Sequence, residues 1–180
     1  LREELDMSAN EFWTNSDGLN VRFGLEKATP SVEGILSTMG DEHTVVVNLD
    51  YANITSSDAL VSTHPSAGIP DNVHITSATL YVKTAFTSGG SATLSIGLWN
   101  DDGDGTFSVN DADGIDATIA LSAINAIGEH VECDGALVGS NAAFTAGTGD
   151  RPLFVSVSYG TAAFTAGNAD LVIKYRRAGP

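Results

Sequence analysis

The sequence predicts an all-β protein, a jelly-roll-like β-sandwich with an extended N-terminal arm. About eight short stretches alternate apolar with polar residues, which is the pattern of strands with one buried face. Turn-forming residues separate these stretches at close spacing, and the chain holds 19 glycines. No sustained helical stripe competes with this pattern. We therefore expect an arm over residues 1–40 and a β-sandwich domain over residues 41–180.

An immunoglobulin-like sandwich is the alternative fold, but the Cys…Trp…Cys signature of that class is absent because the chain has one cysteine. The same count excludes an internal disulfide and favours assembly in a reducing cytoplasm. A net charge of −15 argues against nucleic acid or an anionic membrane as the main partner. No run of 18 apolar residues predicts a membrane span, and residues 1–6 do not begin a signal peptide.

Within the arm, residues 19–23 alternate between two glycine-containing turns and predict one short strand. Two aromatic residues of the arm, Phe12 and Trp13, need a place to be buried. They pack either on the core of this chain or on a neighbouring subunit. After the arm, residues 44–50 predict the first strand of the sandwich, and residues 59–63 a further short one.

The centre of the sequence predicts two strands, over residues 78–83 and 93–98, joined as a hairpin through Ser88-Gly89-Gly90. Residues 116–128 allow either a short helix, capped by Ser122 and ended by Gly128, or a continuing strand. Residues 130–133 and 136–138 read as one broken strand. Two closing strands are expected at 153–159 and 171–175. The predicted core residues are Leu80, Val82, Leu94, Ile96, Leu98, Val155, Val157, Leu171 and Ile173.

One short pattern, Ala-Phe-Thr-small-Gly, occurs three times, at residues 85–89, 143–147 and 163–167. The spacings are too unequal for a solenoid or propeller repeat. We expect one turn type used three times before a strand, with the phenylalanine anchoring the end of a sheet.

The segment 100–111 fits the register of an EF-hand-type calcium loop, in which oxygen ligands alternate around a tight turn. Gly105 stands at the sixth position, where the turn is sharpest, and Phe107 at the eighth. The expected ligands of Ca²⁺ are Asn100, Asp102, Asp104, Thr106 through its carbonyl, Ser108 and Asp111. Asp113 and Asp116 are substitute ligands nearby.

This loop departs from the EF-hand pattern in three ways. Its first position is Asn rather than Asp, its last is the short Asp111 rather than Glu, and it follows a strand rather than a helix. The alternative interpretation is an exposed acidic turn without metal. The sequence contains no catalytic motif: it has no H-E-x-x-H, G-x-S-x-G, P-loop or dinucleotide fingerprint. We therefore expect no catalytic residues and no other cofactor.

Three phrases carry a resemblance: residues 76–100, the run CDGALVG at 133–139, and AAFTAGNADLVIKY at 162–175. They resemble virion structural proteins of tailed bacteriophages, and NSDGLNVRFG at 15–24 is similar in style. The resemblance implies a small non-enzymatic β-sandwich that decorates or stabilises the outside of a capsid. It implies the major capsid protein as partner, self-association as a homotrimer, and a place in the virion after assembly in the host cytoplasm.

Two further functions stay open. A tail or fibre component would share the same sequence features. A calcium-dependent carbohydrate-binding module would share the sandwich and the acidic loop, but it would usually expose clustered tryptophan or tyrosine. A glycan-directed enzyme is a third class, for which two carboxylates would have to face each other across a cleft.

Overall fold

The computed structural model describes residues 12–14, 20–22, 42–61, 67–103, 105–142 and 151–177. The chain divides into two compact units, Leu1–Ser37 and Thr38–Pro180. In the first unit, strands β1 (Phe12–Thr14) and β2 (Asn20–Arg22) pair antiparallel. The sequence predicted the second of these strands but missed the first.

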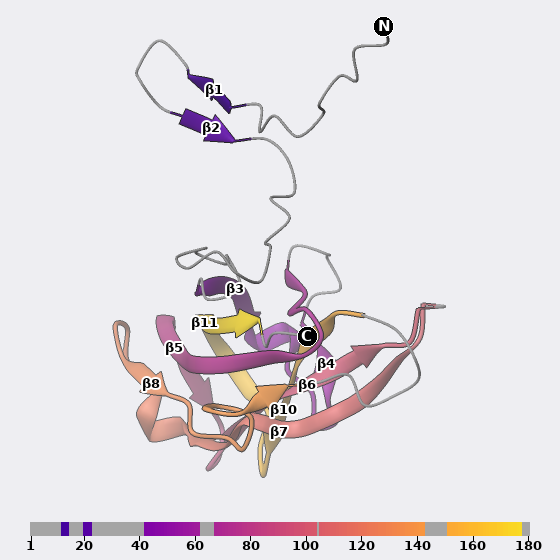
Figure 1. Cartoon of the computed structure of the whole chain (residues 1–180). Coiled ribbons are helices and arrows are strands. Elements are labelled where there is room, and N and C mark those ends of the chain that lie inside the picture. Colours follow the sequence, from indigo (N-terminus) through magenta and orange to yellow (C-terminus); the bar gives the residue numbers. More distant parts are fainter. Residues whose placement is uncertain are drawn as a thin grey trace, which may run out of the picture. The chain divides into compact units, whose positions relative to one another are not determined.

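The second unit is built from two antiparallel sheets (Figure 1). In one sheet the strand order is β3-β11-β5-β8, with β9 also paired to β5. In the other sheet the order is β4-β10-β6-β7. The strands are β3 (His43–Asp50), β4 (Ala59–Leu60), β5 (Val73–Ser88), β6 (Thr93–Asp101), β7 (Phe107–Ala120), β8 (His130–Glu132), β9 (Asn141–Ala142), β10 (Leu153–Gly160) and β11 (Phe164–Arg177).

The strand pairs are nested around the hairpin of β6 and β7. Strand β5 pairs with β8, β4 with β10, and β3 with β11. In this order, the two strands of each pair flank the preceding pair along the chain. A long double ribbon of this kind, rolled so that successive pairs alternate between two sheets, is the jelly roll. The predicted all-β fold and its jelly-roll version are therefore confirmed.

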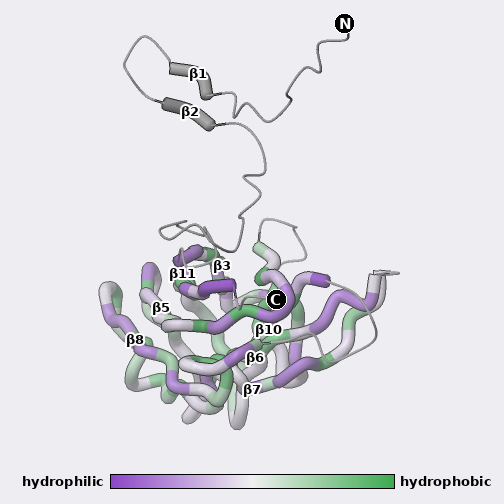
Figure 2. Tube along the Cα trace, viewed as in Figure 1, coloured by the Kyte–Doolittle hydropathy of each residue, from purple (hydrophilic) through white to green (hydrophobic). Residues whose placement is uncertain are grey.

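The core lies between the two sheets and consists of the inward-facing residues of the strands, which alternate along each strand with outward-facing ones. All nine residues that the sequence predicted to be core are buried. Figure 2 shows the alternation of apolar and polar residues along the strands. Strand β10 departs from it, since Phe154 and Ser156 are buried as well as Leu153, Val155 and Val157.

The expected hairpin at Ser88-Gly89-Gly90 is wrong. Strands β5 and β6 do not pair with each other, because β5 lies in one sheet and β6 in the other. The glycines therefore form a corner between the sheets. Two amphipathic strands joined by a Gly-Gly turn have the same local sequence pattern in a hairpin and in a corner between two sheets. The pairing of β5 with β11 and of β6 with β10 is what makes this turn a corner.

Of the two alternatives for residues 116–128, the continuing strand is confirmed as far as Ala120 and the short helix is wrong. Strand β7 continues to Ala120, and a single 3-10 turn follows at Leu121–Ala123. Ile124 enters the core while Ile127 stays 75% exposed, so the two isoleucines do not form one buried helical face. The broken strand is confirmed only at β8, because residues 136–139 form turns. No helix of the described residues is long and apolar enough to cross a membrane.

Two of the three Ala-Phe-Thr-small-Gly segments are strand rather than turn. One ends β5, the other begins β11, and the two pair with each other antiparallel. Phe86 and Phe164 pack edge to face with ring centroids 5.3 Å apart, a favoured aromatic geometry. The hydroxyls of Thr87 and Thr165 lie 2.8 Å apart. The phenylalanines anchor the end of the sheet as expected, and the copy at 143–147 lies outside the described residues.

Replacing Ile96 by alanine should lower the free energy of unfolding by about 2–5 kcal/mol, because its side chain is fully buried between the sheets. Urea denaturation monitored by far-UV circular dichroism measures the loss. Ile127→Ala is the matched control, and because that side chain is exposed its effect should stay within about 0.5 kcal/mol. Equal effects of the two variants would contradict the assigned core.

Candidate functional site

The predicted calcium segment forms the end of the β6–β7 hairpin. Asn100 pairs with Ser108 and Asp101 with Phe107, so the segment folds back on itself as a ladder. The backbone N–H of Asp102 donates to the carbonyl of Thr106 over 3.0 Å and closes the turn. Gly105 has a φ of 86°, which confirms the sharp turn that the sequence predicted at this glycine.

Three of the expected calcium ligands meet in one chain of hydrogen bonds. Asn100 Nδ2 donates to Ser108 Oγ over 3.3 Å, and Ser108 Oγ donates to Asp102 Oδ1 over 2.9 Å. Asn110 Nδ2 donates to Asn100 Oδ1 over 2.8 Å, and Asn100 is fully buried. These contacts orient the three ligand oxygens from the protein side, and each of them already accepts one hydrogen bond. Asp104 lies outside the described residues.

The sixth expected ligand lies farther along the hairpin, since Asp111 is opposite Leu98 rather than Asn100. The register of the ladder shifts between these pairs, because β7 bulges. Among the described residues, no group of three His, Cys, Asp or Glu side chains converges as metal ligands do. The Ca²⁺ site therefore remains a prediction that rests on oxygen atoms of mixed type.

The bulge of β7 folds over strand β6 at Gly97. A Cβ at this position would collide with the backbone of Asp111 and Ala112, so glycine is required by close packing. The bulge is held from its other side by the loop after β8. There the N–H of Gly135 donates to the carbonyl of Ile115 over 2.9 Å, and that of Leu137 to Gly114 over 2.8 Å.

A buried carboxylate, Asp116, lies just beyond this bulge. Its Oδ1 accepts the N–H of Thr118 over 3.0 Å, and burial raises its pKa, with the nearby charge of Asp134 adding to the effect. Burial also raises the pKa of the Cys133 thiol to about 12, with Asp116 and two other acidic neighbours contributing. A thiol with this pKa is uncharged at neutral pH and is a poor nucleophile.

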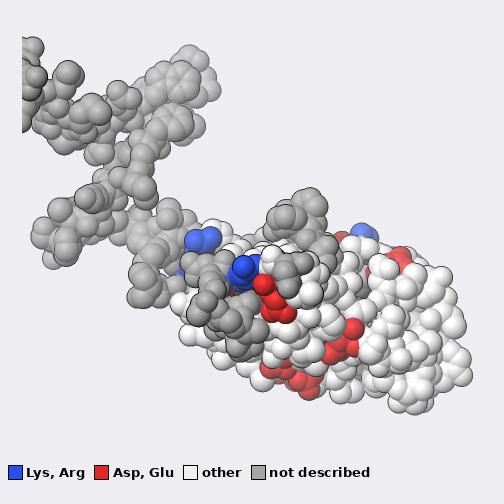
Figure 3. All heavy atoms as spheres, turned by 90° about the vertical axis from the view of Figure 1, so that its right-hand side faces the viewer, with Lys and Arg blue, Asp and Glu red and all other residues white. Residues whose placement is uncertain are grey.

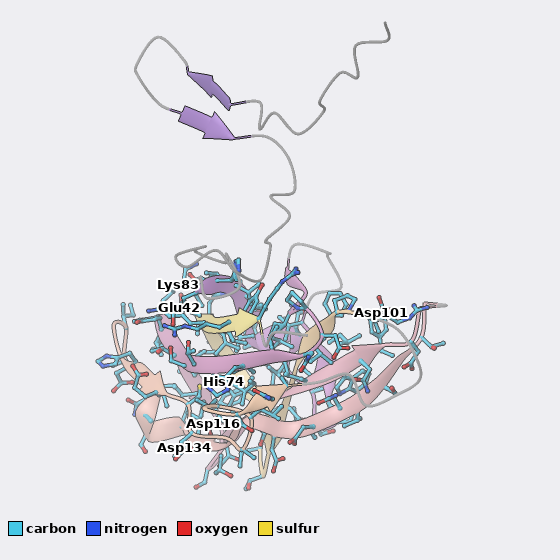
Figure 4. The ribbon with its side chains drawn as sticks, viewed as in Figure 1. Glu42, His74, Lys83, Asp101, Asp116 and Asp134 are labelled. Carbon is cyan, nitrogen blue, oxygen red and sulfur yellow. The ribbon has the colours of Figure 1, made fainter. Side chains whose placement is uncertain are left out.

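A second acidic pair lies at the bulge itself. Burial raises the pKa of Asp111, and a hydrogen bond to the Asp113 side chain raises it further. Figure 4 shows Asp116 and Asp134 together, well apart from Asp101 at the hairpin turn. The acidic residues near β7 thus lie at three places, the Asp111–Asp113 pair, the Asp116–Asp134 pair and the hairpin turn, rather than at one site.

The outer face of the sheet β3-β11-β5-β8 carries a polar network that the sequence did not predict. Asn48 Nδ2 donates to Asp170 Oδ1 over 2.7 Å, and Lys83 forms a 3.2 Å ion pair with Asp170. These hydrogen bonds, that of Asn48 first, lower the pKa of Asp170. Next to the network, Tyr81 is 47% exposed and stacks on His130.

The three described histidines each have a structural partner. His43 stacks on Tyr175 with ring centroids 5.5 Å apart, and His130 stacks on Tyr81. His74 Nδ1 lies 3.1 Å from Asn141 Oδ1. They come from different strands and do not converge, while His64 is outside the described residues.

The face of the second unit drawn in Figure 3 is mostly uncharged. Figure 3 shows one face on which acidic side chains form separate small patches among neutral residues, with fewer basic groups. On this face, the acidic groups are therefore distributed rather than gathered at a single site.

The chain was compared with known proteins in three ways. No family model matches the chain, and no curated protein matches it. Among solved structures it is similar to a chain of the "acidic stable capsid structure" of the Helicobacter pylori bacteriophage KHP30. The TM-score is 0.44 at 12% sequence identity, over 75% of this chain and 86% of the other. A TM-score at this level does not define a shared fold.

Calcium, if it binds the β6–β7 hairpin, should raise the melting temperature by mass action. The comparison is the wild type in Ca²⁺ against the wild type in chelator, with Asp104→Ala and Asp102→Ala both measured in Ca²⁺. Both variants should have the melting temperature of the wild type in chelator. Identical midpoints under all conditions would leave only an acidic turn.

Asp111→Asn and Asp170→Asn should change stability in opposite directions at pH 7 in chelator. The pKa of Asp111 is raised on folding, so its ionised form opposes folding and the amide should be more stable. The pKa of Asp170 is lowered, so its charge stabilises the fold and the amide should be less stable.

The Asp111 difference should shrink as the pH falls through its raised pKa and vanish below about 3.9, the usual pKa of an aspartate, because the carboxyl is then neutral in both states. The Asp170 difference should start to shrink only below about 3.9, because its lowered pKa keeps the folded carboxyl ionised there. Melting temperatures of the wild type and the two variants between pH 3 and pH 8 measure this. Shifts of the same sign at pH 7 would show that the two carboxylates do not differ in environment.

Proposed function

We propose that this chain is a non-enzymatic structural protein of a bacteriophage virion that decorates or stabilises the outside of the capsid. The observation that carries the proposal is where the phage-like phrases fall in the fold. Residues 76–100 contribute most of β5 and β6, and residues 162–175 contribute most of β11. The run at 133–139 is the loop that holds the β7 bulge. The resemblance therefore covers the framework of the jelly roll.

The arrangement of polar side chains supports a scaffold rather than a catalyst. The buried carboxylate of Asp116 accepts hydrogen bonds from backbone N–H groups. The carboxylate of Asp170 accepts a hydrogen bond from Asn48 and forms an ion pair with Lys83. The Cys133 thiol is buried and uncharged. In the part of the chain that the structure describes, these groups stabilise strands and turns, so the function is carried by surfaces.

The proposed partners are the major capsid protein and further copies of this chain, assembled as a homotrimer in the host cytoplasm and then present in the virion. An acidic sandwich suits the solvent-facing side of a particle, because its net charge keeps it soluble. The basic residues that would contact an acidic capsid or a neighbouring subunit are Arg151, Lys174, Arg176 and Arg177.

Reconstitution tests this function. Purified chain is mixed with capsids that lack it, and co-sedimentation is measured against bovine serum albumin at the same concentration. We expect saturable binding at a fixed ratio to the major capsid protein. Incorporation into tails or fibres without capsid binding would contradict the capsid proposal and favour a tail or fibre component.

A carbohydrate-binding role is the second candidate, and one observation favours it. Tyr81 exposes its ring beside the hydrogen-bonding groups of Asn48, Asp170 and Lys83, a combination on which sugars stack and hydrogen-bond. A glycan array distinguishes the candidates. Specific glycan binding that is lost in Tyr81→Ala, together with no capsid binding, would replace the virion proposal.

A further inference from the structure

Within the described part of the sandwich, the two sheets end in four edges, and three of them are protected. Strand β4 has two residues, and β8 and β9 have three and two, so these edges offer little backbone for pairing. The long edge strand β7 is interrupted by register shifts and carries Asp111, Asp113 and Asp116. The loop after β8 also covers its bulge.

The fourth edge, strand β3, is neither short nor interrupted, and no backbone hydrogen bond from a described loop reaches its residues 43–49. It pairs with β11 over eight consecutive residues without a register shift, so it is long and regular. Its sequence, HTVVVNLD, contains no Lys, Arg, Pro or Gly. Among the described strands, none pairs with the side of β3 that faces away from β11. An edge of this kind presents N–H and C=O groups to which another strand can add.

The middle of β3 is also apolar on the outer face of the sheet. Val46 is 56% exposed, and it pairs with the partly exposed Val172 of β11. On either side of Val46, the outward residues Thr44 and Asn48 are uncharged. An exposed valine flanked by neutral residues suits a cross-strand contact better than a solvated edge.

We propose that β3 is a homotypic interface, at which β3 of a second copy of this chain adds antiparallel about a two-fold axis. The strand is self-complementary, which selects a second copy over an unrelated strand. An axis at Val46, perpendicular to the sheet, places Val46 against its own symmetry mate. It also places Thr44 opposite Asn48 of the partner copy, and inward-facing valines opposite each other, so the core face continues across the contact.

Charge defines how far this ladder extends. In the same register the next residues beyond it, Glu42 and Asp50, would oppose each other as like charges, which is unfavourable. The contact is therefore limited to residues 43–49 of each copy. It does not depend on a capsid and should form in solution, so it goes beyond the proposed function. Combined with a trimer, a two-fold contact would give an assembly of two trimers.

The test is the molar mass of the purified full-length chain, measured by light scattering after size-exclusion chromatography at micromolar to tens of micromolar concentration. The wild type should form an even-numbered assembly. Val46→Lys places two ammonium groups against each other at the contact and should halve that mass. The matched control is Val109→Lys, since Val109 is 52% exposed on the protected edge strand β7, and this variant should keep the wild-type mass.

Thermal melts by circular dichroism establish that both lysine variants fold, which the exposure of the two valines favours. A wild-type monomer or trimer would overturn the proposal, because the β3 edge would then be unused or covered by the chain itself. A Val46→Lys variant that is folded and keeps the full mass would overturn it as well. If the molar mass of the assembly fell in both variants, the added positive charge would explain the dissociation, and the β3 contact would be rejected as well.

Discussion

Strand β11 lies between β3 and β5 and pairs with both, so the first, middle and last parts of the second unit meet in one sheet. The β5–β11 ladder extends from Val73 to Ser88, and its far end is fixed by the packing of Phe86 on Phe164. This ladder brings the last strand of the chain back to its middle. The β6–β10 pairing does the same for the opposite sheet. The nesting of all other strand pairs follows from these two closures.

Local alternation was enough to predict the strands and the inward residues, because burial on one face imposes a period of two. It could not predict strand partners. The corner at Ser88-Gly89-Gly90 resembles a hairpin turn, and its true role depends on β10 and β11, which lie more than sixty residues later. For the same reason the segment after β7 resembled a helix: a capping serine and a terminal glycine are local signals, whereas the burial of Ile124 without Ile127 depends on the tertiary fold.

The candidate sites divide in the same way. The sharp turn at Gly105 was readable, because the turn and its residues are neighbours in sequence. The inward position of Asn100 could have been found, since it continues the alternation of Leu94, Ile96 and Leu98. The hydrogen bond of Asn48 to Asp170 joins residues that are 122 apart in the sequence, so no local sequence pattern predicts it. The unprotected edge of β3 likewise became visible only once the order of strands in the sheet was known.

The central claim is that this jelly roll functions through its surfaces as part of a virion. The most direct measurement is quantitative mass spectrometry of density-gradient-purified virus particles from a lysate that contains this chain. The claim predicts that the chain follows the major capsid protein through every fraction at a constant molar ratio. Absence of the chain from purified particles, with its presence in the lysate, would contradict the claim.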